Sequence, residues 1–228
     1  MGSSLKKILC TVKFDLFRQI GLTMFGAVAG AIILRVAIVQ ESSVFYISTF
    51  MAWVISIMTS LLFGAVSLPQ TFDQAVGMGM TRRLFISCYL IGALAVNTIL
   101  LLLVEMVYHA EKWFITTKLA HLPVEAGVDI WMESWLLVPF VLLLSVLRML
   151  FGTLTLKLGN KVFLVSYIAA AALVLLFRHL PEVYPKATEK LLTSVMRFTE
   201  LNWCMLLLAA AIIVYGVIFG MLRRQQVK

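Results

Sequence analysis

Long apolar runs separated by short polar segments dominate this chain of 228 residues. A helix needs about 20 mostly apolar residues to cross the hydrocarbon core of a bilayer. Six runs reach that length, and none shows the alternation of a membrane β-strand. We therefore predict an all-α, polytopic membrane protein with six transmembrane helices in one domain, residues 1–228. The predicted spans are Ile20–Val39, Phe45–Leu68, Leu84–Tyr108, Trp135–Leu156, Val162–Leu180 and Trp203–Leu222.

Three segments outside these spans have patterns of their own. Residues 1–18 place apolar side chains at helical spacing between lysines, which predicts a helix lying on the inner leaflet. A soluble amphipathic helix packed on a partner is the alternative. The outer segments 109–134 and 181–202 are predicted to hold short amphipathic or re-entrant helices, because backbone at membrane depth must satisfy its own hydrogen bonds.

Composition agrees with a membrane protein surrounded by lipid. Hydrophobic residues make up 62% of the chain and charged residues 13%, whereas about a quarter of the residues in an ordinary soluble domain are charged. The net charge of +8 does not predict a nucleic-acid partner, because the basic residues gather at the ends of apolar runs. The three cysteines and three histidines have no metal-ligand spacing, so we predict no metal site.

The distribution of charge predicts the orientation. With the N-terminus inside, the inner segments carry most of the lysines and arginines, and the outer segments carry most of the acidic residues. The positive-inside rule therefore predicts a multi-pass protein of the plasma membrane with both termini in the cytoplasm.

Residues 69–83, "PQTFDQAVGMGMTRR", form a polar cytoplasmic link between the second and third spans. Pro69 is typical of the first turn of a helix. Phe72, Val76 and Met80 follow at a spacing of four and form a narrow apolar stripe, which predicts a helix lying along the membrane surface. The polar residues on its other faces are Gln70, Asp73, Gln74 and Thr81.

Two glycines and two arginines lie in the second half of this link and also bear on its structure. Gly77 and Gly79 each weaken a helix by about 1 kcal/mol relative to alanine, and they permit close approach of a partner's backbone. We expect Arg82 and Arg83 to lie at the C-terminal end of the helix, where its dipole favours cations. The alternative is a plain re-entry turn with positive-inside arginines.

The stretch Phe72–Phe85, "FDQAVGMGMTRRLF", resembles the cytoplasmic coupling segment of type-2 ABC exporter permeases. The similarity is closest to small bacterial permeases that export peptides or confer resistance to antimicrobial peptides. The matching residues are Phe72, Ala75, Gly77 or Gly79, Thr81, Arg82, Arg83 and Phe85. The order of the spans and the amphipathic segments extends the resemblance over the whole chain.

The resemblance implies a transport subunit that moves an amphipathic or hydrophobic substrate, such as a peptide, out of the cytoplasm. Two permeases, either two copies or this chain with a sister chain, would form a dimer above two separate ABC ATPase subunits. The implied ATPase-coupling residues are Phe72, Gln74, Ala75, Gly77, Gly79, Met80, Thr81, Arg82 and Arg83. ATP and Mg²⁺ would be bound by the ATPase, because "GMGMTRR" lacks the spacing of a phosphate-binding loop.

Two polar residues inside the spans are candidates for the translocation pathway. Arg148 lies about 13 Å above the cytoplasmic end of the fourth span, where it either lines an inner vestibule, pairs across the assembly or snorkels. Asn97, midway along the third span, either forms an interhelical hydrogen bond or contacts substrate. For close helix packing we single out Gly26 with Gly30 and Gly216 with Gly220, two G-x-x-x-G pairs.

Two other functions remain as alternatives. The substrate-capturing membrane subunit of a vitamin-type importer has a similar number of spans but needs no arginine-ended coupling segment. An intramembrane enzyme would need glutamate and histidine motifs within the spans. Because no such motif and no catalytic constellation stands out, we predict a chain without catalytic residues of its own.

Overall fold

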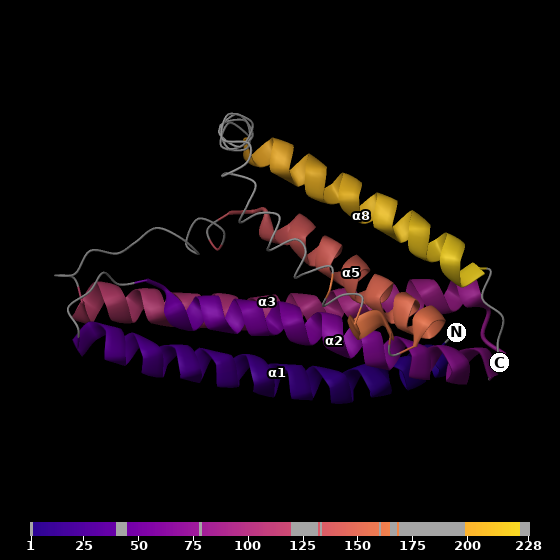
Figure 1. Ribbon diagram of the computed structural model, residues 1–228, viewed down its shortest axis with the longest axis horizontal. Coiled ribbons are helices and arrows are strands. Elements are labelled where there is room, and N and C mark those ends of the chain that lie inside the picture. The colour runs from indigo at the N-terminus through magenta and orange to yellow at the C-terminus, as the bar shows by residue number, and fades with distance from the viewer. Residues whose placement is uncertain are drawn as a thin grey trace.

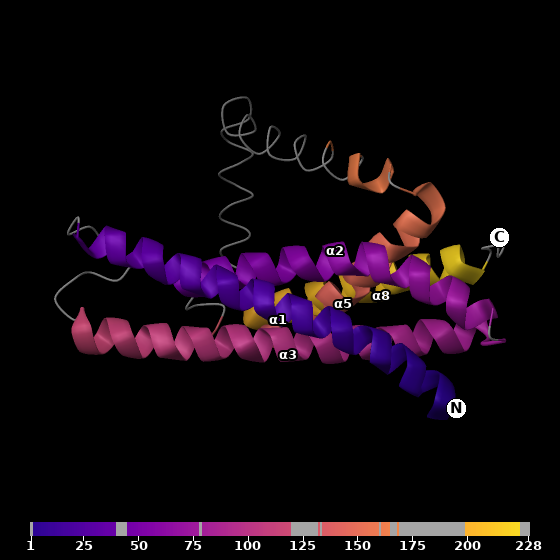
Figure 2. The same ribbon diagram turned by 90° about the horizontal axis from the view of Figure 1, so that it is seen from below.

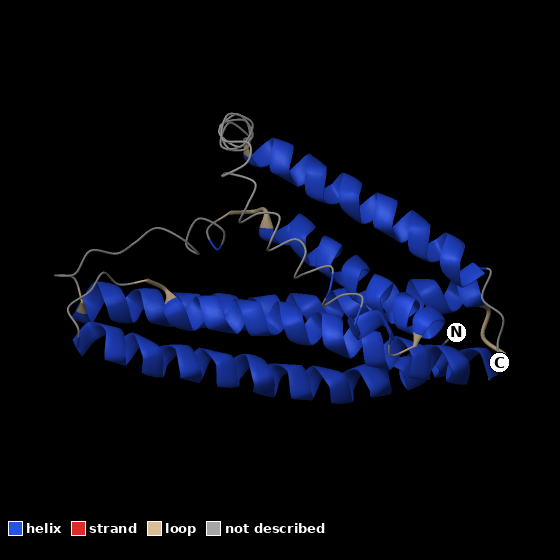
Figure 3. Ribbon diagram, viewed as in Figure 1, coloured by secondary structure: helices blue, strands red, loops and turns tan. Residues whose placement is uncertain are grey.

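A computed structural model of the chain describes residues 2–39, 45–77, 79–119, 132, 134–159, 161–164, 168 and 199–223. Within these ranges the structure is helical and contains no strand (Figure 3). The long helices are α1 (Gly2–Val39), α2 (Ile47–Gly77), α3 (Arg82–Lys118), α5 (Leu137–Leu158) and α8 (Glu200–Arg223).

The helices form a bundle with α2 at its centre, in which α1 and α3 run in one direction and α2, α5 and α8 run in the other. Helix α2 packs against α1, α3 and α5, whereas α8 packs chiefly on α5. Figure 1 shows the start of α1, the end of α8 and the turn between α2 and α3 at the same end of the bundle. We call this the inner end, following the orientation expected from the charge pattern, and the opposite end the outer end.

In the described part of the chain, five helices are long and apolar enough to cross a membrane, as expected of a multi-pass membrane protein. They correspond to the first, second, third, fourth and sixth predicted spans. Helix α3, with 37 residues, is about 55 Å long at 1.5 Å per residue, whereas the hydrocarbon core is about 30 Å thick. Of the predicted span Val162–Leu180, the structure describes only 162–164 and 168, and the rest lies outside the described residues.

The prediction of a separate N-terminal helix over residues 1–18 is wrong. Residues 2–18 are the first turns of α1, which continues without a break into the first span (Figure 2). The stretch between Phe17 and Ile20 holds neither proline nor glycine, so nothing in its local chemistry ends the helix. The buried side chain of Gln19 also shows that the helix is already packed in the bundle at this point.

The first outer segment differs from the prediction, and most of the second lies outside the described residues. Residues 109–118, expected to leave the third span, continue α3 to Lys118. Residues 120–131 and 133 lie outside the described residues, as do residues 181–198 of the second outer segment. The final residues of that segment are described, and α8 begins among them, at Glu200.

Two apolar clusters form the core, one toward each end of the bundle. The inner cluster joins the ends of α2 and α8 to the start of α3, and Phe72, Phe85 and Leu222 are fully buried in it. The outer cluster includes Tyr46 and Tyr108, whose rings lie 5.3 Å apart. Buried polar side chains, among them Ser60, Asn97 and Arg148, also lie inside the bundle, and an ionisable group inside a membrane helix is a candidate for function.

Candidate functional site

Pro69 lies inside α2 and does not begin a new helix. Helix α2 runs through Pro69 to Gly77, and Figure 2 shows that it changes direction in its last turns. Membrane helices tolerate an internal proline better than soluble ones do. The predicted surface helix is therefore wrong as a separate element, because most of segment 69–83 is an extension of the second span.

A Schellman motif ends α2. The Met80 N–H donates to the Ala75 carbonyl (3.0 Å), and the Gly79 N–H donates to the Val76 carbonyl (2.9 Å). Gly79 has φ +80°, a left-handed conformation that favours glycine. A Cβ atom on either Gly77 or Gly79 would meet nothing within 4 Å among the described residues. The backbone conformation therefore accounts for Gly79, whereas Gly77 has no steric requirement in this structure.

Aromatic packing holds the two arms of this turn together. Phe72 of α2 and Phe85 of α3 are fully buried, and their rings meet edge to face with centroids 5.3 Å apart. Tyr89, one turn further along α3, lies 5.8 Å from Phe85. Phe72 thus faces the interior, as does Ala75. Both residues belong to the predicted coupling set and act here as packing residues of the turn.

The outward surface of the turn is polar. Gln70, Asp73, Gln74 and Arg83 are exposed. Thr81 caps α3, since its hydroxyl accepts a hydrogen bond from the Leu84 N–H (3.4 Å).

The position predicted for the two arginines within a helix is wrong. Arg82 and Arg83 are the first residues of α3, so the helix dipole there disfavours cations. Arg83 is exposed at this position, whereas Arg82 is only partly exposed.

Arg148 lies inside the bundle, with only 1% of its surface exposed. Its Nη1 donates to Gln19 Oε1 across 3.3 Å, and Asp15 lies within electrostatic range. Gly64 packs directly against the stem and backbone of Arg148 and so brings α2 and α5 close together at this level. The guanidinium therefore interacts with α1 of its own chain.

The cluster around Arg148 contains polar atoms without partners among the described residues. The buried atoms that have no hydrogen-bond partner in the described structure are Arg148 Nε, Gln19 Nε2, Thr23 Oγ1 and Asp15 Oδ2. On α1, Asp15, Gln19 and Thr23 follow at a spacing of four, so they share one helix face. Native proteins usually satisfy buried polar groups with a protein group or with bound water.

Hydrogen bonds and aromatic ring contacts together connect this cluster to the turn. Ser67 interacts with Asp15, and the Ser67 hydroxyl lies 2.9 Å from the Tyr89 hydroxyl. Tyr89 in turn packs on Phe85, the partner of Phe72. Contiguous contacts therefore run from segment 69–83 through Tyr89 and Ser67 to Asp15 and the charge cluster.

Asn97 joins three helices near the middle of the bundle. Its Oδ1 accepts a hydrogen bond from the Ser60 hydroxyl (2.6 Å), and its Nδ2 donates to the Ser145 hydroxyl (2.9 Å). All three side chains are almost fully buried. An interhelical hydrogen bond is one of the two roles that the sequence predicts for Asn97. A contact between Asn97 and substrate stays a prediction.

The two predicted glycine pairs have different surroundings. Cβ atoms added to Gly26 and Gly30 would lie 2.6 Å from Ile55 Cδ1 and 2.5 Å from Ser48 Cα, so α1 crosses α2 closely there. Cβ atoms added to Gly216 and Gly220 would meet nothing within 4 Å in the described part of the chain. That face of α8 is thus left open to a neighbour or to lipid.

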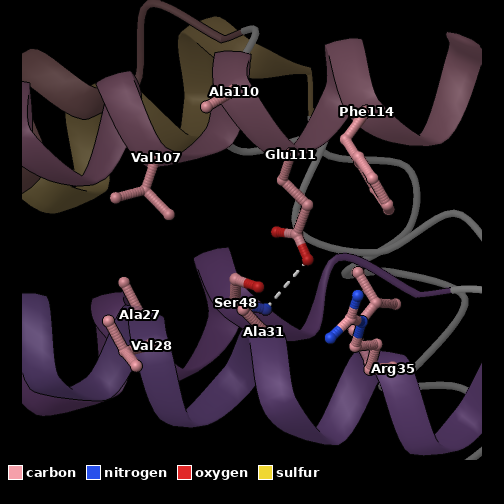
Figure 4. Close-up of a pocket in the computed structure, with 10 residues that line it drawn as sticks. Ala27, Val28, Ala31, Arg35, Ser48, Val107, Ala110, Glu111 and Phe114 are labelled. Atoms are coloured by element: carbon pink, nitrogen blue, oxygen red, sulfur yellow. Dashed lines mark hydrogen bonds between the residues drawn. The ribbon is translucent and has the colours of Figure 1, made fainter.

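An outer groove of about 410 Å³ lies between α1 and α3 (Figure 4). Midway along it, Glu111 of α3 caps α2 with both carboxylate oxygens. Oε1 accepts from the Ser48 N–H (2.9 Å), and Oε2 accepts from the Thr49 N–H (2.8 Å) and the Thr49 hydroxyl (2.7 Å). Arg35 of α1 also lines the groove.

No protein-family model, curated protein or solved structure matches this chain. Among the described residues, no group of three histidine, cysteine or acidic side chains is placed to hold a metal ion. The assignment to a family therefore depends on the residues of the chain itself.

Sequence reasoning missed several residues of these sites. Asp15 and Gln19 were assigned to a surface helix or its end, although their spacing of four on an apolar helix was a visible signal. Glu111 was assigned to an outer loop, and its role as a cap depends on a contact across 62 residues that no local pattern reveals. Gly152 was overlooked, although a Cβ atom there would lie 2.6 Å from the Gly64 carbonyl oxygen.

Proposed function

We propose that this chain is the transmembrane permease subunit of an ATP-binding-cassette exporter. It moves an amphipathic or hydrophobic substrate, such as a peptide, out of the cytoplasm. A separate ABC ATPase binds ATP and Mg²⁺ and docks on the inner end of the bundle. A second permease, either another copy or a sister chain, completes the pathway, and both termini lie in the cytoplasm.

The construction of segment 69–83 is the observation that supports this proposal most directly. Its apolar side chains face inward, with Phe72 and Ala75 buried, and its polar side chains Gln70, Asp73 and Gln74 face outward. A turn with this division offers a polar surface to a cytoplasmic partner and remains firmly joined to the bundle. A plain re-entry turn needs neither the aromatic contact nor the two additional turns of helix.

The contacts behind this segment suggest how force would reach the spans. Because Phe72 and Phe85 hold the ends of α2 and α3 together, a partner that displaces the turn moves both helices. The hydrogen bond between Ser67 and Tyr89 lies directly above, and it leads to Asp15 and the charge cluster on α1 and α5. In this proposal Arg148 belongs to the mechanism that changes the bundle's conformation, and its contact with substrate remains a prediction.

Purification of the tagged chain from its native membrane, with detection of any ABC ATPase that is recovered with it, tests the proposal. Arg83 is the arginine to reverse, because it is exposed and Arg82 is only partly so. We expect Arg83→Glu to recover about tenfold less ATPase, the effect of losing one strong interface residue. The readout is the ATPase-to-permease ratio after purification in mild detergent.

Lys118→Glu is the matched control, because Lys118 is an exposed cation at the opposite end of the same helix. It should leave the recovery of ATPase unchanged. Equal recovery with wild type, Arg83→Glu and Lys118→Glu would contradict docking through Arg83. Failure of the wild-type chain to recover any ATPase would contradict the exporter assignment itself.

A further inference from the structure

The outer groove between α1 and α3 has small apolar walls. Ala27, Ala31 and Ala110 lie along it, and Val28 and Phe114 flank it (Figure 4). Val28 is 56% and Phe114 39% exposed on the outer surface of the bundle. The groove therefore opens sideways into the apolar belt that the bundle presents to lipid, and its alanines leave a channel suited to a slender hydrocarbon.

The two charged residues of the groove have different roles. Glu111 is 6% exposed, and both its oxygens are engaged by hydrogen bonds from the start of α2. The positive end of that helix dipole also compensates its charge. Arg35 is exposed and forms no ion pair or hydrogen bond within the described residues. Among the residues that the structure describes, the groove thus offers one available cation, at the end of an apolar channel.

The depth of Arg35 matches that of lipid headgroups. Arg35 is the penultimate residue of the apolar span Asp15–Val36. On the facing helix, Trp113 is 65% exposed beside Glu111, and exposed tryptophans concentrate at the membrane–water interface. A group bound to Arg35 would therefore lie at the level of the phosphates, with the channel extending from it toward the middle of the bilayer.

We propose that the outer groove binds one phospholipid of the surrounding bilayer, with an acyl chain along the alanines and its anionic headgroup on the Arg35 guanidinium. Charge complementarity favours phosphatidylglycerol over phosphatidylcholine, because one arginine near an anionic lipid surface is worth about 1 kcal/mol, or about fivefold in occupancy. This site does not depend on the exporter assignment.

Native mass spectrometry of the full chain tests the site. The protein is first placed in nanodiscs that hold equal amounts of phosphatidylglycerol and phosphatidylcholine, and is then released from them in the gas phase. Wild type should retain one phospholipid, with a preference of about fivefold for phosphatidylglycerol. Arg35→Gln should remove that preference, whereas Arg83→Gln, at an exposed arginine of the inner end, should keep it. Ala31→Phe and Ala110→Phe should each abolish retention by filling the channel.

Ile212→Phe enlarges an exposed apolar side chain on α8, away from the groove, and should retain lipid as wild type does. Ala31 and Ala110 are both exposed on the groove's rim, and thermal unfolding of each variant distinguishes a filled groove from a misfolded chain. Retention by folded Ala31→Phe and Ala110→Phe at the wild-type level would overturn the proposal. So would an unchanged phosphatidylglycerol preference in Arg35→Gln.

Discussion

At the scale of residues, Glu111 and Arg148 are the two acidic or basic side chains that are almost fully buried within the described part of the bundle. Glu111 accepts three hydrogen bonds from the start of α2 and so replaces a missing local cap. Among the described residues, Arg148 has one hydrogen bond, to Gln19, and its buried Nε has no partner. The first arrangement is typical of a structural group, whereas the second leaves room for bound water or for rearrangement.

Replacing Glu111 with alanine should destabilise the protein, because two N–H groups and one hydroxyl lose their acceptor. Buried groups left in this state cost about 1–3 kcal/mol. Glu111→Gln keeps one carbonyl oxygen as an acceptor and should therefore lose less stability than Glu111→Ala. Thermal unfolding in detergent measures the effect, with Glu105→Ala on the same helix as the control, since Glu105 is only partly buried and has no hydrogen bond in the described structure. An equal effect of both alanine variants would show that Glu111 does not act as a cap.

Replacing Arg148 with methionine should destabilise the protein by about 1.5–3 kcal/mol, because the buried Gln19 amide oxygen loses its charged hydrogen-bond donor. Asp15→Asn should relieve part of that loss, because the neutral amide no longer needs a nearby cation. A double-mutant cycle in detergent should give a coupling of about 0.5–3 kcal/mol. Additive effects would mean that Asp15 and Arg148 do not interact. Exposed Arg83→Met should leave stability unchanged.

At the scale of elements, the sequence predicted the positions of the spans better than their ends. Apolar runs of about 20 residues are a strong signal, and five of them correspond to the described long helices. The ends differed because tertiary contacts extend the helices. Phe72 and Phe85 stabilise the last turns of α2 and the first turn of α3, and the buried Gln19 belongs to an α1 that has no break.

The candidate site was predictable only in part, because it also depends on tertiary contacts. The composition of residues 69–83 indicated a special segment, and the structure separates its members into buried packing residues and exposed polar ones. The pairing of Arg148 with α1 depends on which helices are neighbours, and a single sequence does not encode that in any local pattern. Gly79 was recognisable as a helix-weakening residue, but its hydrogen bonds across the turn required coordinates.

The two glycines of the turn should respond in opposite directions to alanine. Gly79→Ala places a Cβ atom in a left-handed conformation, which costs about 1–2 kcal/mol. Gly77→Ala lies in the last turn of α2 with no neighbour within 4 Å, and it should stabilise the helix by up to about 1 kcal/mol. Thermal unfolding in detergent compares the pair. The assigned end of α2 would be wrong if Gly79→Ala proved as stable as Gly77→Ala.

At the scale of the whole molecule, the features that need a partner lie at different places on the bundle. The inner end presents a rigid polar turn, α8 presents an open face that includes Gly216 and Gly220, and the outer groove opens toward lipid. In the proposed exporter these three surfaces would meet an ATPase, a neighbouring helix or lipid, and a phospholipid. A bundle with a buried charge cluster connected to its inner turn is suited to a change of shape driven from the cytoplasmic side.

Site-specific photo-crosslinking in living cells tests the central claim most directly. A photoreactive residue replaces Gln74, which is exposed on the inner turn, or Thr117, which is exposed at the outer end of α3. The account predicts a crosslink to an ABC ATPase from position 74 and none from position 117. No ATPase adduct at position 74, or the same adduct from both positions, would contradict it.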